Sequence, residues 1–87
     1  LEELQDCIAH STNVEREIEG RELAAAINAF LKTLSAFDRN VFVCRYWYLD
    51  PVRDIAKATH ASESRIKSIL FRLRKKLRKY LTEEGLL

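Results

Sequence analysis

The sequence predicts an all-α protein, a short bundle of about four helices that ends in a helix-turn-helix with a long second helix. Its 87 residues include two glycines and one proline, too few for the many tight turns of a sheet protein. Leu, Ala, Glu, Lys and Arg are abundant, and these residues favour helices. Apolar residues also recur at helical spacing in several segments.

The length allows one domain, because a domain usually needs about 100 residues or more. The charged residues are unevenly distributed along the chain. Residues 1–50 contain five Lys and Arg against nine Asp and Glu, whereas residues 51–87 contain ten Lys and Arg against four Asp and Glu. The second half is therefore suited to binding an anion. We expect an acidic linker with a helical segment at 1–19, the helix-turn-helix domain at 20–82 and a tail at 83–87.

The first long helix is expected from about Val14 to Leu34. Thr12 followed by Glu15 forms a capping-box pattern at its start. Apolar residues then recur with mostly helical spacing: Ile18, Leu23, Ile27, Phe30, Leu31 and Leu34.

A second helix is expected to open at Ser35, which with Asp38 repeats the capping-box pattern. It is apolar nearly all round, containing Val41, Phe42, Val43, Cys44, Tyr46, Trp47 and Tyr48. Such a helix is either buried on several sides or shows part of its surface to a partner.

The third helix should start at Asp50 and Pro51, with Asp50 as the cap and Pro51 in the first helical position. It is short, because Thr59, His60 and Ala61 interrupt the pattern. Ser62 can then cap a fourth helix that continues to about Leu81.

The third and fourth helices are typical of a helix-turn-helix, which joins two helices by a turn of three or four residues. Ala56 is the small residue expected at the close crossing, and Ile55 supplies an apolar contact beside it. His60 lies in the turn, where a positive φ often favours glycine. The fourth helix directs an apolar stripe inward: Ile66, Ile69, Leu70, Leu73 and Leu77.

The face opposite that stripe is the expected DNA-binding surface. At 100° per residue it carries Ser64, Ser68, Phe71, Arg72 and Lys75, flanked by Arg65, Lys67 and Lys79. Residues at the start of such a helix reach base edges in the major groove, and Arg72, Arg74 and Lys75 are better placed for phosphates. The alternative is that this face binds nothing: it is simply exposed to water, and its cations stabilise the helix by lying near the negative end of its dipole. The predicted site comprises Ser62, Glu63, Ser64, Arg65, Lys67, Ser68, Phe71, Arg72 and Lys75.

Other classes of function find little support in the sequence. Cys7 and Cys44 are far apart and are expected to be reduced thiols. With His10 and His60 they do not form a credible metal site. The sequence also has no phosphate-binding glycine loop and no supported Ser-His-Asp arrangement. We expect no enzyme activity, metal, cofactor or membrane span, and a cytoplasmic location.

The run from Leu34 to Phe42, with Arg45-Tyr46, Asp54-Ile55-Ala56, the segment 62–68 and the segment 71–78, resembles region 4 of bacterial RNA polymerase sigma factors of the sigma-70 family. The similarity covers about residues 20–82 and is greatest to the extracytoplasmic-function type. It implies binding to the −35 promoter element through the helix opened by Ser62. It also implies docking of the other helices on the flap of the polymerase β subunit, with residues 1–19 as the linker between two sigma domains.

Two positions depart from the family pattern. His60 stands where the family usually has glycine, and Ile69 where a polar or basic residue is common, which affects the turn and one flank of the DNA face. Two alternatives remain: a helix-turn-helix regulator without flap contact, and an interaction module whose aromatic helix binds an anti-sigma factor.

Overall fold

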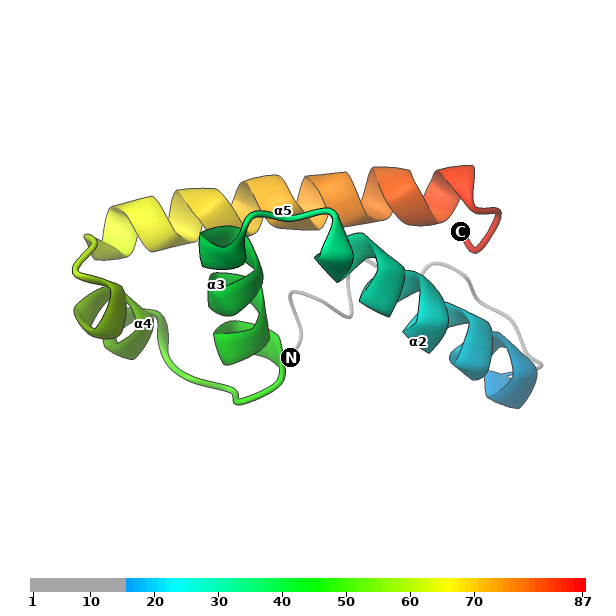
Figure 1. Ribbon diagram of the computed structural model, residues 1–87, viewed down its shortest axis with the longest axis horizontal. Coiled ribbons are helices and arrows are strands. Elements are labelled where there is room, and N and C mark those ends of the chain that lie inside the picture. Colours follow the sequence, from blue (N-terminus) through cyan, green and yellow to red (C-terminus); the bar gives the residue numbers. More distant parts are fainter. Residues whose placement is uncertain (1–15) are drawn as a thin grey trace.

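The computed structural model describes residues 16–87, which form four α-helices and no strand. The helices are α2 (Arg16–Lys32), α3 (Ala36–Tyr46), α4 (Val52–Thr59) and α5 (Glu63–Glu83). Figure 1 shows α5 running the length of the molecule, with α4, α3 and α2 along one side of it. The predicted all-α class is confirmed. The predicted cap at Thr12 and the apolar segment before it lie outside the described residues.

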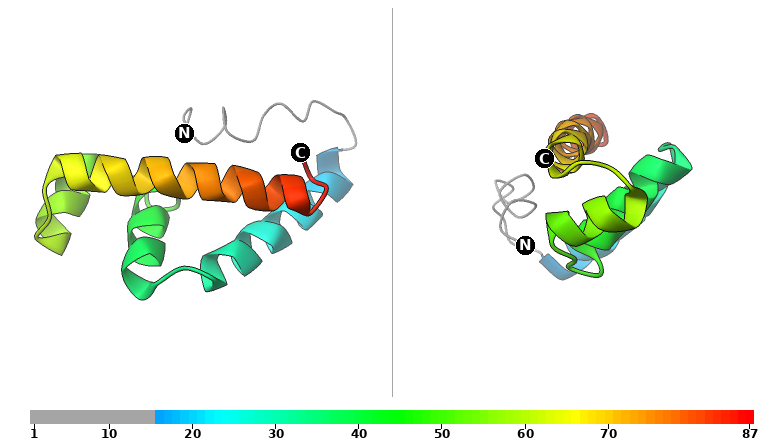
Figure 2. Two further views of the ribbon diagram at one scale, coloured as in Figure 1. Left: turned by 90° about the horizontal axis from the view of Figure 1, so that it is seen from above. Right: turned by 90° about the vertical axis from the view of Figure 1, so that its left-hand side faces the viewer.

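Helix α5 is the scaffold on which the other helices pack. Its 21 residues, at about 1.5 Å per residue, make a rod roughly 31 Å long. The predicted inward stripe is buried, and Leu81 extends it by one turn. Helices α4, α3 and α2 all contact α5, and two further views show how they lie against it (Figure 2). The apolar stripe of α5 therefore joins the whole fold. No helix within residues 16–87 combines the length and the apolar character needed to cross a bilayer.

Aromatic rings form the part of the core where α2, α3 and α5 meet. The ring centroid of Phe30 lies 6.2 Å from that of Phe42 and 5.7 Å from that of Tyr80. Phe42 in turn packs edge-on to Tyr46 at 4.8 Å. These distances fall in the range that aromatic pairs favour. The resulting cluster fixes α3 across the middle of α5.

Serine caps start both α3 and α5, as predicted. The hydroxyl of Ser35 accepts a hydrogen bond from the amide of Asp38 (3.1 Å), and that of Ser62 from the amide of Arg65 (3.0 Å). Each bond satisfies one amide that the first helical turn leaves without a backbone partner. The Asp38 carboxylate, however, is bonded to Arg72 of α5. Ser62 thus fixes where the candidate DNA-binding helix begins.

The predicted start of α4 is wrong by one residue, because Pro51 and not Asp50 is the N-cap. Pro51 is extended (φ −65°, ψ 152°), and its carbonyl accepts from the amides of Asp54 and Ile55. No side chain caps this helix. Asp50 is held toward α3 instead: its amide donates to the carbonyl of Cys44 (2.9 Å), and its own carbonyl accepts from Arg45 (3.1 Å).

The turn between α4 and α5 has the backbone that the sequence predicted. His60 is left-handed, with φ 57° and ψ 37°. The amide of Ala61 donates to the carbonyl of Ala56 (2.9 Å) and the amide of His60 to that of Lys57 (3.3 Å). This pair of bonds is the Schellman arrangement, in which glycine is the usual left-handed residue. His60 therefore carries backbone strain at the centre of the turn.

Other predicted helix ends need small corrections. Helix α2 ends at Lys32, before Leu34, although Leu34 is still buried. Helix α3 ends at Tyr46, with Trp47 as its C-cap, so Tyr48 lies outside the helix. Leu49 then takes a positive φ of 61°, which reverses the chain toward α4. Helix α5 continues two residues past Leu81.

Candidate nucleic-acid interface

All nine predicted site residues lie on the surface, at or within one helix. Ser62 caps α5, and the other eight are exposed along it: Glu63, Ser64, Arg65, Lys67, Ser68, Phe71, Arg72 and Lys75. Phe71, an apolar residue among these polar ones, is 56% exposed. Helix α5 as a whole carries eight Lys and Arg against two Glu. Its outward face can therefore attract a polyanion.

The helix-turn-helix packing directs the apolar side chains of α4 and α5 inward. Ile55 and Ala56 of α4 are buried, and Ala56 is the small residue predicted at the crossing. Ile69 is also buried, as predicted, so its departure from the family pattern adds no side chain to the outward face. It belongs to the apolar stripe, where a polar residue would lack a partner. The residues of the predicted site left outward are polar, apart from Phe71.

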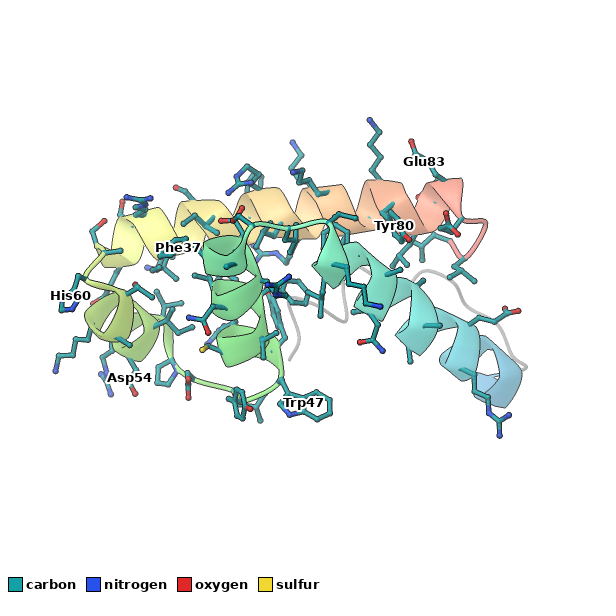
Figure 3. The ribbon with its side chains drawn as sticks, in the orientation of Figure 1. Phe37, Trp47, Asp54, His60, Tyr80 and Glu83 are labelled. Atoms are coloured by element: carbon teal, nitrogen blue, oxygen red, sulfur yellow. The ribbon has the colours of Figure 1, made fainter. Side chains whose placement is uncertain are left out.

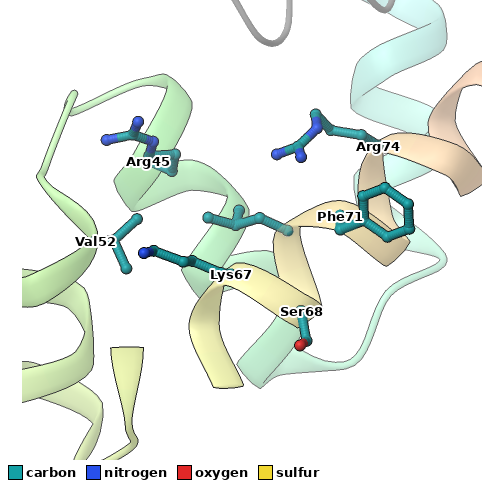
Figure 4. Close-up of a pocket in the computed structure, with 7 residues that line it drawn as sticks. Arg45, Val52, Lys67, Ser68, Phe71 and Arg74 are labelled. Carbon is teal, nitrogen blue, oxygen red and sulfur yellow. The ribbon is translucent and has the colours of Figure 1, made fainter. Parts of the chain in front are cut away.

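A basic hollow of about 540 Å³ opens beside the middle of α5 (Figure 4). Lys67, Ser68 and Phe71 of the predicted site line it together with Arg45, Val52, Leu70 and Arg74. Arg74 donates to the hydroxyl of Tyr46 (2.9 Å), so its guanidinium is held toward α3. Arg45 had no place in the predicted site, because no local pattern in the sequence relates α3 to α5.

Three cations of the predicted site have specific contacts. Arg72 donates to the Asp38 carboxylate at 3.1 Å. The guanidinium carbon of Arg65 lies 5.5 Å from the centroid of the Phe37 ring, and the Lys75 ammonium 5.3 Å from that of Phe71. Both ring distances are within the range of cation–π attraction. The sequence had placed these cations on a face of α5 but gave them no partners.

Comparison with known families gives one match. The model for sigma-70, region 4, matches residues 30–79, which run from the end of α2 through most of α5. The chain belongs to this family. No match was found among curated proteins or among solved structures. The family is one of DNA-binding helix-turn-helix domains from sigma factors and related regulators.

This region 4 domain has a second surface on the side of α3 that faces α2. An apolar groove of about 670 Å³ lies there, lined by Ala24, Ile27, Asn28, Leu31, Phe42, Val43, Tyr46, Trp47 and Tyr48. Trp47 is 78% exposed and Tyr48 65%. Figure 3 shows Trp47 at the end of α3 that is farther from α5. Val41 and Phe42 of the aromatic helix are buried, Cys44 and Tyr46 are partly buried against the core, and Trp47 and Tyr48 beyond its end are exposed, so part of this surface is open to a partner.

The predictions of a reduced thiol and of no metal site concern Cys44 and the possible metal ligands of the described residues. Cys44 is a free thiol whose pKa is raised by burial and by the nearby Asp50 carboxylate. Its sulfur lies 3.7 Å from the side-chain oxygen of Asn40. Cys7 lies outside the described residues. Within residues 16–87 no three His, Cys, Asp or Glu side chains are grouped as metal ligands would be.

Proposed function

We propose that this chain reads the −35 promoter element in the major groove, as region 4 of a sigma factor of the extracytoplasmic-function type. The supporting observation is the division of α5 between a buried apolar stripe and an exposed polar face that begins at the Ser62 cap. In a helix-turn-helix the first residues of the second helix reach base edges. Residues 20–82 would form the DNA-binding domain and residues 1–19 the linker, acting in the bacterial cytoplasm.

The side chains at the start of α5 match the donors and acceptors of base edges. A Glu63 carboxylate can accept from the amino group of cytosine, and Arg65 or Lys67 can donate to guanine. Ser64 and Ser68 can do either, and they are exposed on the same helix. This mixture of charge suits selective recognition, since contacts to phosphates alone would need no acid.

The third and fourth turns of α5 are assigned to the DNA backbone and to an apolar contact with a base. Arg72 and Lys75 are exposed and can hold phosphates on either side of the bases. The exposed ring of Phe71 can contact the methyl group of thymine. The basic hollow lies beside these residues, and its cations would add to the attraction of the backbone.

The test is selection of duplexes from a randomised pool, followed by salt titrations with the enriched sequence and a scrambled duplex of the same composition. Each phosphate contact contributes about −0.9 to the slope of log K against log salt concentration, where K is the association constant, so four contacts, for example, would give about −3.6. The proposal requires the enriched duplex to bind more tightly than the scrambled one across the titration. Equal affinities for the two duplexes, with a steep slope for both, would mean that the chain binds DNA only by electrostatic attraction, and this would refute sequence recognition.

For the protein partner, we propose that the apolar groove between α2 and α3 receives the β flap of RNA polymerase. The exposure of Trp47 and Tyr48 at its edge supports this assignment, because large exposed apolar patches usually mark binding surfaces. Capture of a purified β-flap fragment by the chain tests it. A regulator without polymerase contact would bind DNA but not the flap.

The same exposed aromatic residues would also suit an anti-sigma factor, the second candidate role. Trp47 and Tyr48 would then be covered by the inhibitor and unavailable to the flap. Competition separates the two roles: an anti-sigma factor should displace the flap fragment, and an inhibitor that binds elsewhere should not.

A further inference from the structure

The first turn of α3 contacts the DNA-facing arginines of α5 from the side. Asp38 Oδ2 lies 3.1 Å from Arg72 Nη2, although the two residues are 34 positions apart. The Asp38 side chain is 17% exposed and that of Arg72 48%, so the carboxylate is largely covered while much of the guanidinium remains open. The preceding residue, Phe37, contacts Arg65. The first turn of α3 therefore contacts two of the residues predicted to bind DNA, Arg65 and Arg72.

We propose that Asp38 and Phe37 are positioning residues that set the DNA specificity of this domain by holding Arg72 and Arg65 before DNA arrives. This inference rests on the proposed function of α5. Neither residue need touch DNA; each acts through an arginine. Figure 3 shows Phe37 in the first turn of α3, directly beneath α5.

Arginine gains most from such support. Its long side chain loses much rotamer freedom when it binds, and a chain already held in place loses less. The contact to Asp38 uses one of five N–H donors on the guanidinium, which leaves the others available to a phosphate or a base. The Phe37 ring uses no donor of Arg65 at all, since it attracts the charge through its face.

The charge of Asp38 has a second effect, opposite in sign. A carboxylate beside the interface repels phosphates whatever the sequence, so it weakens the binding of all DNA. An arginine that is already paired is also less free to reach any phosphate nearby. Asp38 should thus lower general affinity and raise the preference for the correct duplex, and these two effects can be measured separately.

The decisive experiment is a double-mutant cycle on the whole chain with Asp38→Ala, Arg72→Ala and the double variant. Dissociation constants are measured for the enriched and the scrambled duplex. We expect Asp38→Ala to tighten scrambled binding roughly two- to fivefold, from the lost repulsion. The ratio between duplexes should fall roughly three- to tenfold, because an ordered contact from Arg72 to a phosphate fixes the register in which the start of α5 meets the bases. In the Arg72→Ala background Asp38→Ala should leave that ratio unchanged.

Asp54→Ala is the matched control, because Asp54 is an exposed acid on α4 whose ion pair is with Arg53. It changes the net charge equally and should tighten both duplexes alike. Asp38→Glu should restore the ratio, since it keeps the carboxylate. Circular dichroism and thermal melting check that each variant folds; if Asp38→Ala does not, Asp38→Asn replaces it in the cycle.

For the second contact, Phe37→Tyr should keep the preference of the wild-type chain, because the aromatic face is retained. Phe37→Leu should relax it at the base pair read by Arg65, at equal helix content. If Phe37→Leu leaves the selected sequence unchanged, Phe37 does not position Arg65.

The outcomes show whether the proposed function fails or only the inference that Asp38 and Phe37 position the two arginines. If the wild-type chain has no preference between duplexes, the proposed function fails and the inference with it. If the wild-type chain has a preference but Asp38→Ala behaves like Asp54→Ala, only the inference fails. An effect of Asp38→Ala on the ratio that persists without Arg72 also overturns it.

Discussion

Replacing His60 by glycine should make the domain more stable. His60 is exposed and left-handed at φ 57°, where an ordinary L-residue costs about 1–2 kcal/mol. Glycine removes this cost but adds about 0.5–1 kcal/mol of conformational freedom to the unfolded chain. The difference leaves a net gain of roughly 0.5–1 kcal/mol. For a domain of this size that corresponds to about 3–6 °C in the melting temperature.

The assay is thermal melting followed by circular dichroism at the helix band, with His60→Ala as the control. Alanine also has a Cβ and should suffer the same strain, so its melting temperature should not rise. The two Schellman bonds that close the turn are backbone bonds and persist in both variants. If His60→Gly melts at or below His60→Ala, the left-handed strain assigned to this turn does not exist in solution.

Three further predictions concern the two surfaces and the thiol. Arg65→Ala should weaken binding of the enriched duplex by about 1–3 kcal/mol and relax selection at one base pair, whereas equal loss on every duplex would mean a phosphate contact. Trp47→Ser with Tyr48→Ser should abolish capture by the β flap while the melting curve and DNA binding stay as in the wild-type chain; unchanged capture would place the flap elsewhere. The raised pKa of Cys44 lowers its thiolate fraction, so iodoacetamide should react slowly at pH 8 and faster after unfolding in urea; equal rates would contradict this. Because Cys7 also reacts, the Cys44 rate is read by peptide mapping.

The exposed residues Trp47 and Tyr48 are followed by a residue with a strained backbone. Leu49 has a positive φ of 61° and is exposed, so its side chain neither relieves the strain nor joins the core. Backbone strain tends to persist where function maintains it. The loop is in this respect consistent with a binding surface at the end of α3, next to the apolar groove.

Local patterns were a good guide wherever one helix decides the outcome. The caps at Ser35 and Ser62 follow from a hydroxyl placed three residues before a free amide, and the structure contains both bonds. The stripe that includes Ile66 and Leu73 follows from the 3.6-residue period of the helix. The same rule failed at Asp50, because contacts with α3 hold that residue away from the amides of α4.

The existence of the helices, the left-handed turn at His60 and the exposed face of α5 could be predicted from the sequence, because each depends on spacing within a few residues. Which side chains of other helices contact that face could be seen only in the folded structure. Asp38 and Arg72 are separated by 34 residues, and no periodicity relates a position on α3 to one on α5. A helical period fixes the direction in which a side chain points, whereas its partner depends on how two helices pack.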